Sequence, residues 1–293
     1  MSILVMAVPV FVLTMLIEWR LSLGHDGRGY WLKDTAASLS MGIGNLLLIL
    51  TLKMVKLALF MAVYEYRLIE LPAEAWWVWL LMIPAEDFCY YWYHRTAHEV
   101  RLFWAAHVNH HSATSYNLST ALRQSWTSPF YSFWFWLPLP LLGFHPLMMV
   151  TAQAISLLYQ YWIHTELIEK MGAFEWVFNT PSHHRVHHGS NPKYLDCNHG
   201  GIFIIWDRLF GTFQEEEERP VYGLTVNIES YNPFVVAFHE WRAIGRDVWG
   251  AQTWRGRFLY VFGPPGWRED GTGKLAKDLR REALVAAELE ALA

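Results

Sequence analysis

The sequence is poor in charged residues and nearly devoid of cysteine. Charged residues make up 17% of its 293 residues, against about 25% in soluble domains. The only cysteines, Cys89 and Cys197, are too few for a disulfide scaffold. The formal net charge of −4 lacks the basic excess typical of nucleic-acid binding. We therefore expect neither a disulfide-stabilised fold nor a nucleic-acid partner.

Apolar and aromatic residues are abundant instead. Hydrophobic residues make up 53% of the chain and aromatic residues 16%, including 17 tryptophans. Disordered chains are poor in aromatic residues, whereas tryptophan is enriched where a membrane meets water. This composition predicts an integral membrane protein. The competing interpretation is a soluble protein with a large buried helical core.

Four apolar stretches are delimited by charged residues, and they cover residues 1–17, 35–52, 75–93 and 124–165. The last is uncharged over 42 residues, about twice what one membrane helix needs. It contains the turn signal Gly143–Pro146, which predicts a hairpin of helices at 127–142 and 146–163. The fold class expected is all-α, a bundle of about four to five membrane helices with a helical cap on the cytoplasmic face.

The N-terminal stretch differs from a secretory signal peptide. It has no basic start and no small-residue cleavage site, and the bulky, charged segment Glu18–Arg20 follows it. We therefore expect an uncleaved first membrane span. The predicted organisation has three parts: N-terminal membrane helices at 1–74, a histidine-rich core at 75–213 that includes the membrane hairpin at 126–163, and a polar, helical extension at 214–293.

This layout predicts where the histidines lie. The third span ends near His94, and the hairpin starts near Trp126 and returns near His164. The segments between these points therefore share one membrane face. Basic residues after Lys170 slightly favour the cytoplasm for that face. The protein is expected to be multi-pass, in the inner membrane if its source is bacterial.

Of the 14 histidines, 12 lie between His94 and His199. Residues three or four apart share a helix face, and imidazole is the commonest metal ligand in proteins. Eight histidines are too many for one ion and predict a site for two. They form three boxes: His94 and His98; His107, His110 and His111; His184, His187 and His188.

The ligand type indicates the chemistry. Catalytic zinc typically takes three protein ligands, and carboxylate-bridged di-iron bundles carry Glu-x-x-His pairs. These boxes contain almost no carboxylate, and imidazole also suits iron, so we expect a di-iron site that activates O2. A membrane zinc hydrolase remains an alternative, although its H-E-x-x-H base is replaced by Arg95 after His94. A metal or haem carrier is a third possibility.

The boxes resemble those of the membrane fatty acid hydroxylase/sterol desaturase superfamily. The segments Tyr159–Glu166, Asn179–Gly189, Ile205–Phe213 and Tyr222–Thr225 are similar to its alkylglycerol monooxygenase branch. The resemblance covers roughly residues 75–245. It implies a membrane enzyme that uses O2 and two irons on a lipid C–H bond, with tetrahydropterin as a possible reductant. Related hydroxylases carry a further histidine pair near the hairpin end, which makes His164 a ninth predicted ligand.

Other residues are candidates for supporting roles. Asp87 shares a helix stripe with His94 and His98, so we expect it to accept a hydrogen bond from a metal-bound imidazole. Glu86 is expected to face lipid headgroups. The remaining candidates are His183, as a neighbour of the metal ligands or a ligand itself; His199, as a weaker ligand candidate; and Asn117 and Gln124, which would orient substrate or ligands or serve only as polar structural residues.

The predicted function is hydroxylation of a C–H bond in a lipid or other apolar substrate, with O2 and a separate electron donor. A lipid or sterol desaturase with the same di-iron site is the nearest alternative. The hairpin and third span would form the slot for the alkyl chain. Glu215–Glu218 is expected to be a solvated loop, or alternatively a docking site for a basic redox partner, and 274–293 a surface helix.

Overall fold

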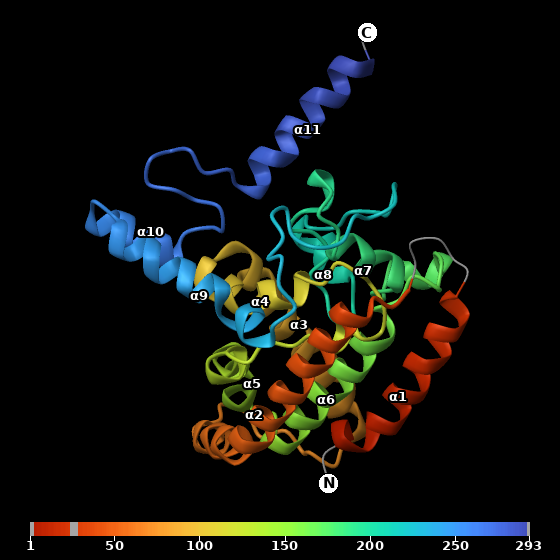
Figure 1. Cartoon of the computed structure of the whole chain (residues 1–293). Coiled ribbons are helices and arrows are strands. Elements are labelled where there is room, and N and C mark those ends of the chain that lie inside the picture. The colour runs from red at the N-terminus through yellow and green to blue at the C-terminus, as the bar shows by residue number, and fades with distance from the viewer. Residues whose placement is uncertain (1–2, 24–28, 292–293) are drawn as a thin grey trace.

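The computed structural model describes residues 3–23 and 29–291, and it is helical without a β-strand in these ranges. Four helices pack side by side as a bundle (Figure 1): α1 (Ile3–Ser22), α2 (Leu32–Tyr64), α3 (Trp76–Glu99) and α6 (Pro146–Trp162). A cap at one end contains α4 (Arg101–His111), α7 (Pro181–His187) and α8 (Ile205–Phe210), followed by α9 (Pro233–Gly250), α10 (Trp254–Phe262) and α11 (Ala276–Ala291). The all-helical prediction is confirmed.

The helices α1 and α2 have the length and apolarity of membrane spans, and no other helix in the described ranges meets both criteria. Only 6% of the apolar window of either helix is buried within the protein. Exposed apolar side chains such as Leu13 and Val55 cover their outer faces. Water does not favour so continuous an apolar surface, whereas the bilayer interior does.

The predicted hairpin is correct in its second arm only. Helix α6 coincides with the expected helix at 146–163, and Gly143 forms the turn before it in the left-handed region, with φ +106°. The continuous helix expected at 127–142 is wrong. The segment consists of the 3-10 helices η2 (Ser128–Phe130) and η3 (Ser132–Trp136) and the short α5 (Pro138–Leu142). Three prolines, Pro129, Pro138 and Pro140, remove backbone donors and interrupt the helix.

The largest apolar core lies where this broken arm packs against α3 and α6. It contains Val78 and Met82 of α3, Trp136 of η3, and Met149 and Ala152 of α6. Small side chains such as Ala152 allow α3 and α6 to approach closely. Both helices run from this core to the cap, so the core fixes how their ends are placed relative to each other.

Glu86 lies inside this core, and the prediction that it faces headgroups is wrong. Its side chain is 1% exposed, and its Oε1 atom accepts a hydrogen bond of 3.0 Å from Nε1 of Trp136. The reason is its position on the side of α3 that packs against η3 and α6. A polar group buried there is costly unless it finds a partner, and the indole N–H of Trp136 supplies one.

Candidate metal centre

The three histidine boxes lie on helices that meet in the cap. His94 and His98 occupy the last turns of α3, where the spacing of four residues places both on one face. The second box occupies the end of α4, and the third lies on α7 and the residue after it. His164 follows the end of α6 by two residues. The structure thus brings together segments far apart in the sequence.

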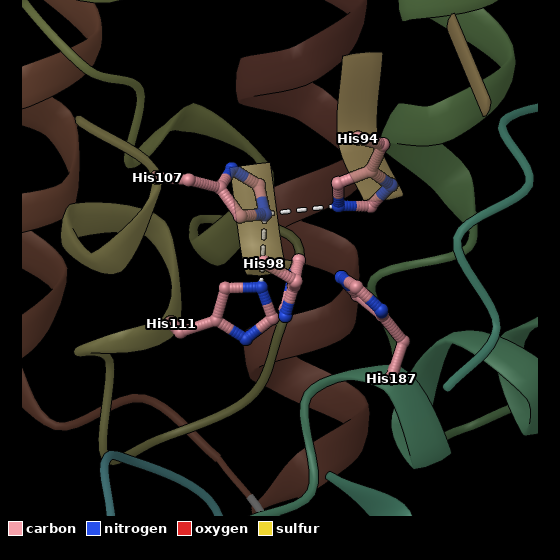
Figure 2. Close-up of side chains that lie close together, drawn as sticks. All are labelled: His94, His98, His107, His111 and His187. Atoms are coloured by element: carbon pink, nitrogen blue, oxygen red, sulfur yellow. Dashed lines mark hydrogen bonds between the residues drawn. The ribbon is translucent and has the colours of Figure 1, made fainter. Parts of the chain in front are cut away.

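The nine predicted ligand histidines form two groups, in each of which one ring nitrogen per residue lies within 4.8 Å of the others. The first group is shown in Figure 2 and contains His94, His98, His107, His111 and His187. The second group contains His110, His164, His184 and His188. No Asp, Glu or Cys of the described ranges belongs to either group.

The second and third boxes divide between the two groups in the same way. In the second box, His107 and His111 join the first group and His110 joins the second. In the third box, His184 and His188 join the second group and His187 joins the first. Around a helix axis, the last histidine of each box lies about 40° to one side of the first, and the middle histidine lies about 60° to the other side. Each of these boxes therefore contributes to both groups.

The separations between ring nitrogens fit a shared metal ion. In the first group, Nε2 of His107 lies 2.9 Å from that of His94 and 3.0 Å from that of His111. In the second, Nε2 of His164 lies 3.2 Å from that of His110 and 3.0 Å from that of His184. Two nitrogens about 2.1 Å from one ion lie about 3.0–3.4 Å apart in octahedral or tetrahedral geometry.

Three further ring nitrogens support the same conclusion. The Nε2 atoms of His98, His187 and His188 are buried and have no hydrogen-bond partner. Buried polar atoms are almost always satisfied, and an exception requires an explanation such as an ion. Because each of these atoms lies in one of the two groups, metal coordination would satisfy all three.

The opposite nitrogen of several rings is held by the protein. An Nδ1–H that donates to an oxygen leaves the Nε2 lone pair free to bind metal. Backbone carbonyl oxygens lie 2.7–2.8 Å from three such Nδ1 atoms: that of His199 near His94, that of Cys197 near His187, and that of Gln160 near His164. A carboxylate oxygen of Asp196 lies 3.3 Å from Nδ1 of His98. These contacts set both the tautomer and the ring orientation.

Burial keeps these imidazoles neutral. Removal from water lowers the pKa of His107, His110 and His111 on α4 well below the usual range, and neighbouring histidines lower it further. On α7, burial and the nearby His199 lower the pKa of His187 to about 3. A histidine must be neutral to bind a metal ion. The electrostatics of the cap therefore favour the form that coordinates.

Asp87 has a different role from the one predicted, because the expected hydrogen bond to a box histidine is not formed. Its carboxylate accepts from the backbone N–H groups of Ile202 (2.6 Å) and Phe203 (2.9 Å) and from the Trp206 indole (3.0 Å). Nδ1 of His94 is already bound to the carbonyl of His199. Asp87 therefore does not contact a predicted metal ligand itself; it fixes the loop whose His199 carbonyl contacts His94.

His183 and His199 lie beside the centre but outside both groups. The buried His183 ring packs edge-on against Phe213, with centroids 5.3 Å apart. The His199 ring lies 5.1 Å from that of His98, and its backbone N–H donates to Oδ1 of Asp207 at 2.7 Å. His199 thus contacts the centre through its backbone carbonyl and ring edge.

Sequence reasoning missed the anchoring role of Asp207, although the segment Ile205–Phe213 was singled out. Its carboxylate also accepts from the N–H of Gly200 and the hydroxyl of Thr212. Asn117 and Gln124 likewise serve the backbone: Asn117 donates to the carbonyl of Gly29 and Gln124 to that of Ala121. Neither is seen to contact the nine histidines in the described ranges.

Arg185 links the third box to the rest of the cap. Its guanidinium binds both carboxylate oxygens of Glu216 at 2.7 Å and donates to the carbonyls of Thr165 and Ile168. The prediction of a wholly solvated loop at Glu215–Glu218 is therefore wrong at Glu216. This ion pair ties α7 to the segment after His164.

Comparison with known proteins is consistent with this centre. Residues 79–212, which contain all nine histidines, match the fatty acid hydroxylase family model. The chain is 42% identical to alkylglycerol monooxygenase of Homo sapiens over 281 residues, covering 94% of this chain and 62% of that protein. It is 41% identical to the Xenopus tropicalis enzyme of the same name over 269 residues, or 92% and 59% of the two chains.

A more distant relative is the ornithine lipid hydroxylase of Rhizobium tropici, 30% identical over 135 residues, or 46% of this chain and 41% of that protein. No solved structure matches. The chain spans about three fifths of the length of the alkylglycerol monooxygenases above, at 59% and 62%.

Proposed function

We propose that the chain, whose residues 79–212 match the fatty acid hydroxylase family model, is a membrane-bound di-iron monooxygenase of that family that hydroxylates a lipid C–H bond. The observation that carries the proposal is the convergence of nine histidines in two groups, eight of them buried and His107 half-buried. An alkylglycerol is the first candidate substrate, since two relatives similar over most of this chain bear that name.

The donor set favours two irons. The five-histidine group and the four-histidine group would hold one ion each, and imidazole is a ligand that suits iron. When bound, the iron pair supplies the reduction of O2: one oxygen atom enters the C–H bond, and the other leaves as water with two electrons and two protons from an external donor. Tetrahydropterin is one such donor to test, and a separate redox protein is another.

The protein's own residues hold and shield this chemistry. The carbonyls of Gln160, Cys197 and His199 orient imidazole rings, so that the ligands need little rearrangement to bind metal. Burial of both groups limits water at the reacting centre. These contacts would keep the oxidant directed at the substrate.

The bundle suggests the path of the substrate. α3 ends at His94 and His98, and α6 ends two residues before His164. An alkyl chain that lay along these helices would bring a C–H bond to the centre. We propose that the membrane part crosses the bilayer more than once, with the histidines on the cytoplasmic side.

Two alternatives predict other products. A desaturase with the same ions would remove two hydrogens and leave no oxygen in the lipid. A zinc hydrolase needs a carboxylate base near its metal, and neither histidine group contains one. Arg95, which follows His94, instead donates to Glu99 and to the hydroxyl of Tyr91, so the hydrolase is the weaker alternative.

The experiment is a turnover assay in ¹⁸O2. The purified protein in lipid nanodiscs receives an alkylglycerol, with tetrahydropterin or a reduced ferredoxin system in separate reactions. We expect a product that has gained one ¹⁸O atom, and none with the His111→Ala variant. A product two hydrogens lighter without ¹⁸O would indicate the desaturase. A hydrolysis product formed equally without O2 would contradict the oxygenase.

A further inference from the structure

Helices α9 and α10 carry an aromatic surface that the proposed chemistry does not use. They stand out to one side of the bundle (Figure 1), while α11 projects beyond the cap. Trp249 at the end of α9 is 91% exposed, and Trp254 at the start of α10 is 82% exposed. So much exposed aromatic surface is unusual in contact with water alone.

The exposed side chains of each helix lie on one face. In α9, Phe234, Phe238 and Trp249 are exposed, while Val236 and Ile244 on the other side are buried. In α10, Trp254, Phe258 and Phe262 follow one another at intervals of four residues, and all three are exposed. Intervals of three and four residues define one helix face. In both helices the exposed aromatic side chains therefore lie on one face.

The charges are divided in a similar way. The two acidic residues of α9, Glu240 and Asp247, turn inward to the buried Arg101 of α4, at 2.7 and 2.8 Å. The four arginines of the pair are exposed: Arg242, Arg246, Arg255 and Arg257. The outer surface of α9 and α10 is thus aromatic and basic.

Two contacts connect this surface to the rest of the protein. Val236 and Ala237 of α9 pack against Met41 of α2, one of the two candidate membrane spans. Arg101, which opens α4, also bonds through its backbone N–H to the carbonyl of Gly263 after α10. The pair is therefore packed against a candidate membrane span on one side and against the helix of the second histidine box on the other.

We infer that α9 and α10 lie in the headgroup layer of the membrane and bind anionic phospholipids. Tryptophan and arginine are suited to this layer, because their apolar parts enter the acyl boundary while their polar parts stay in the headgroups. The exposed arginines match the negative charge of such lipids, and the inward acidic residues avoid repelling it. The contact fixes the depth of α4, and hence of the histidine centre, relative to the bilayer.

The experiment locates spin labels in the full chain reconstituted in phosphatidylcholine vesicles with and without phosphatidylglycerol. Both native cysteines are buried, so new cysteines are the main labelling sites. Phe258→Cys reports on α10 and Leu13→Cys on the candidate span α1. Leu284→Cys on α11 is the matched control, because Leu284 is 63% exposed and Phe258 is 59% exposed. The measurement is the ratio of collisions with O2 to collisions with a water-soluble nickel complex.

We expect the Phe258 label to resemble the Leu13 label in contacting lipid, and the Leu284 label to contact water. The Phe258 ratio should rise with phosphatidylglycerol. Replacing the four arginines by glutamine should remove that rise. Each arginine removed should weaken the partitioning of α9 and α10 into the anionic membrane about five-fold.

Two outcomes would overturn the inference and leave the membrane span intact. One is a Phe258 label in water while the Leu13 label lies in lipid. The other is spin–spin broadening between Phe258 labels, which would show that a second copy covers this face. If the Leu13 label also contacts water, the membrane part of the proposed function fails as well. Each of these outcomes is read from the position of the label relative to the membrane, so a variant that has lost enzymatic activity can still be interpreted.

Discussion

The carboxylate of Asp34, in the first turn of α2, lies 2.8 Å from Nη1 of Arg123, and each side chain is only 1% exposed. Oδ2 of Asp34 also accepts from the backbone N–H groups of Thr114 and Ser115. Nε of Arg123 donates to the carbonyl of Asn109, next to His110. This buried ion pair therefore connects a candidate membrane helix to the second histidine box.

Asp34→Ala is expected to destabilise the protein strongly, because it leaves the Arg123 charge buried without a partner. Breaking a buried ion pair typically costs about 3–5 kcal/mol. The check is the midpoint of thermal unfolding in detergent. The matched control is Glu70→Ala, which removes the largely exposed pair of Glu70 with Arg67 and should cost about 0–1 kcal/mol. Equal midpoints for the two variants would refute the structural role of Asp34.

Loss of His164 is expected to affect one metal ion and not the other. His164 belongs to the four-histidine group, so His164→Ala leaves the five ligands of the first group in place. Metal analysis of the purified variant should show that about one of the two ions is lost. His187→Ala should lose the ion of the first group, and the two variants should differ in the spectrum of the ion that remains.

His199→Ala should keep both ions, because its backbone carbonyl, and not its ring, orients His94. His183→Ala should also keep both, since its ring packs against Phe213 outside the two groups. The measurement is metal content per chain, with His239→Ala on α9 as the control for a histidine that belongs to neither group. If His199→Ala lost one metal ion per chain while His164→Ala kept both, the ninth ligand would be His199 and not His164.

Asp87→Asn should weaken metal retention without abolishing it. The carboxylate accepts from two backbone N–H groups of the loop that orients His94 and from the Trp206 indole on α8. In the asparagine variant an NH2 group, which donates, replaces one of the two acceptor oxygens. Changes at residues that support metal ligands typically cost about 10–100-fold in affinity or activity. The rate of metal release to a chelator measures this effect, with the exposed Glu74→Gln as control. An unchanged rate would show that the loop holds its position without Asp87.

Glu216→Gln should lower thermal stability and metal retention together, since Arg185 and Glu216 form a two-bond ion pair at 2.7 Å beside the third box. Hydrogen bonds to charged groups contribute about 1.5–3 kcal/mol. Glu215→Gln, at an exposed neighbour, is the control and should change neither property. If both variants behave alike, the acidic segment is only a solvated loop.

The grouping of the nine histidines could be predicted from the sequence better than the fold around them. Histidines three and four residues apart lie on the same side of a helix, so the boxes could be recognised from their spacing. His164 could be placed because it follows an apolar helix that returns to the same face. The division of the second and third boxes between two groups was not foreseen, because all three histidines of a box were assigned to one helix face.

Tertiary partners were harder to predict. The break in the first hairpin arm follows from Pro129, Pro138 and Pro140, a local signal that the apolar run obscured. By contrast, nothing near Glu86 in the sequence indicates its bond to Trp136, and nothing near Asp87 indicates the N–H groups of a loop more than a hundred residues away. Such contacts depend on packing between distant segments.

The number and identity of the bound metal ions test the central claim most directly. Protein expressed with ample iron and purified without chelators should contain about two irons per chain and no haem, as two all-histidine groups require. Mössbauer spectroscopy of ⁵⁷Fe-labelled protein should show two non-haem sites. One zinc per chain, a haem spectrum, or less than one metal ion per chain under these conditions would contradict the account.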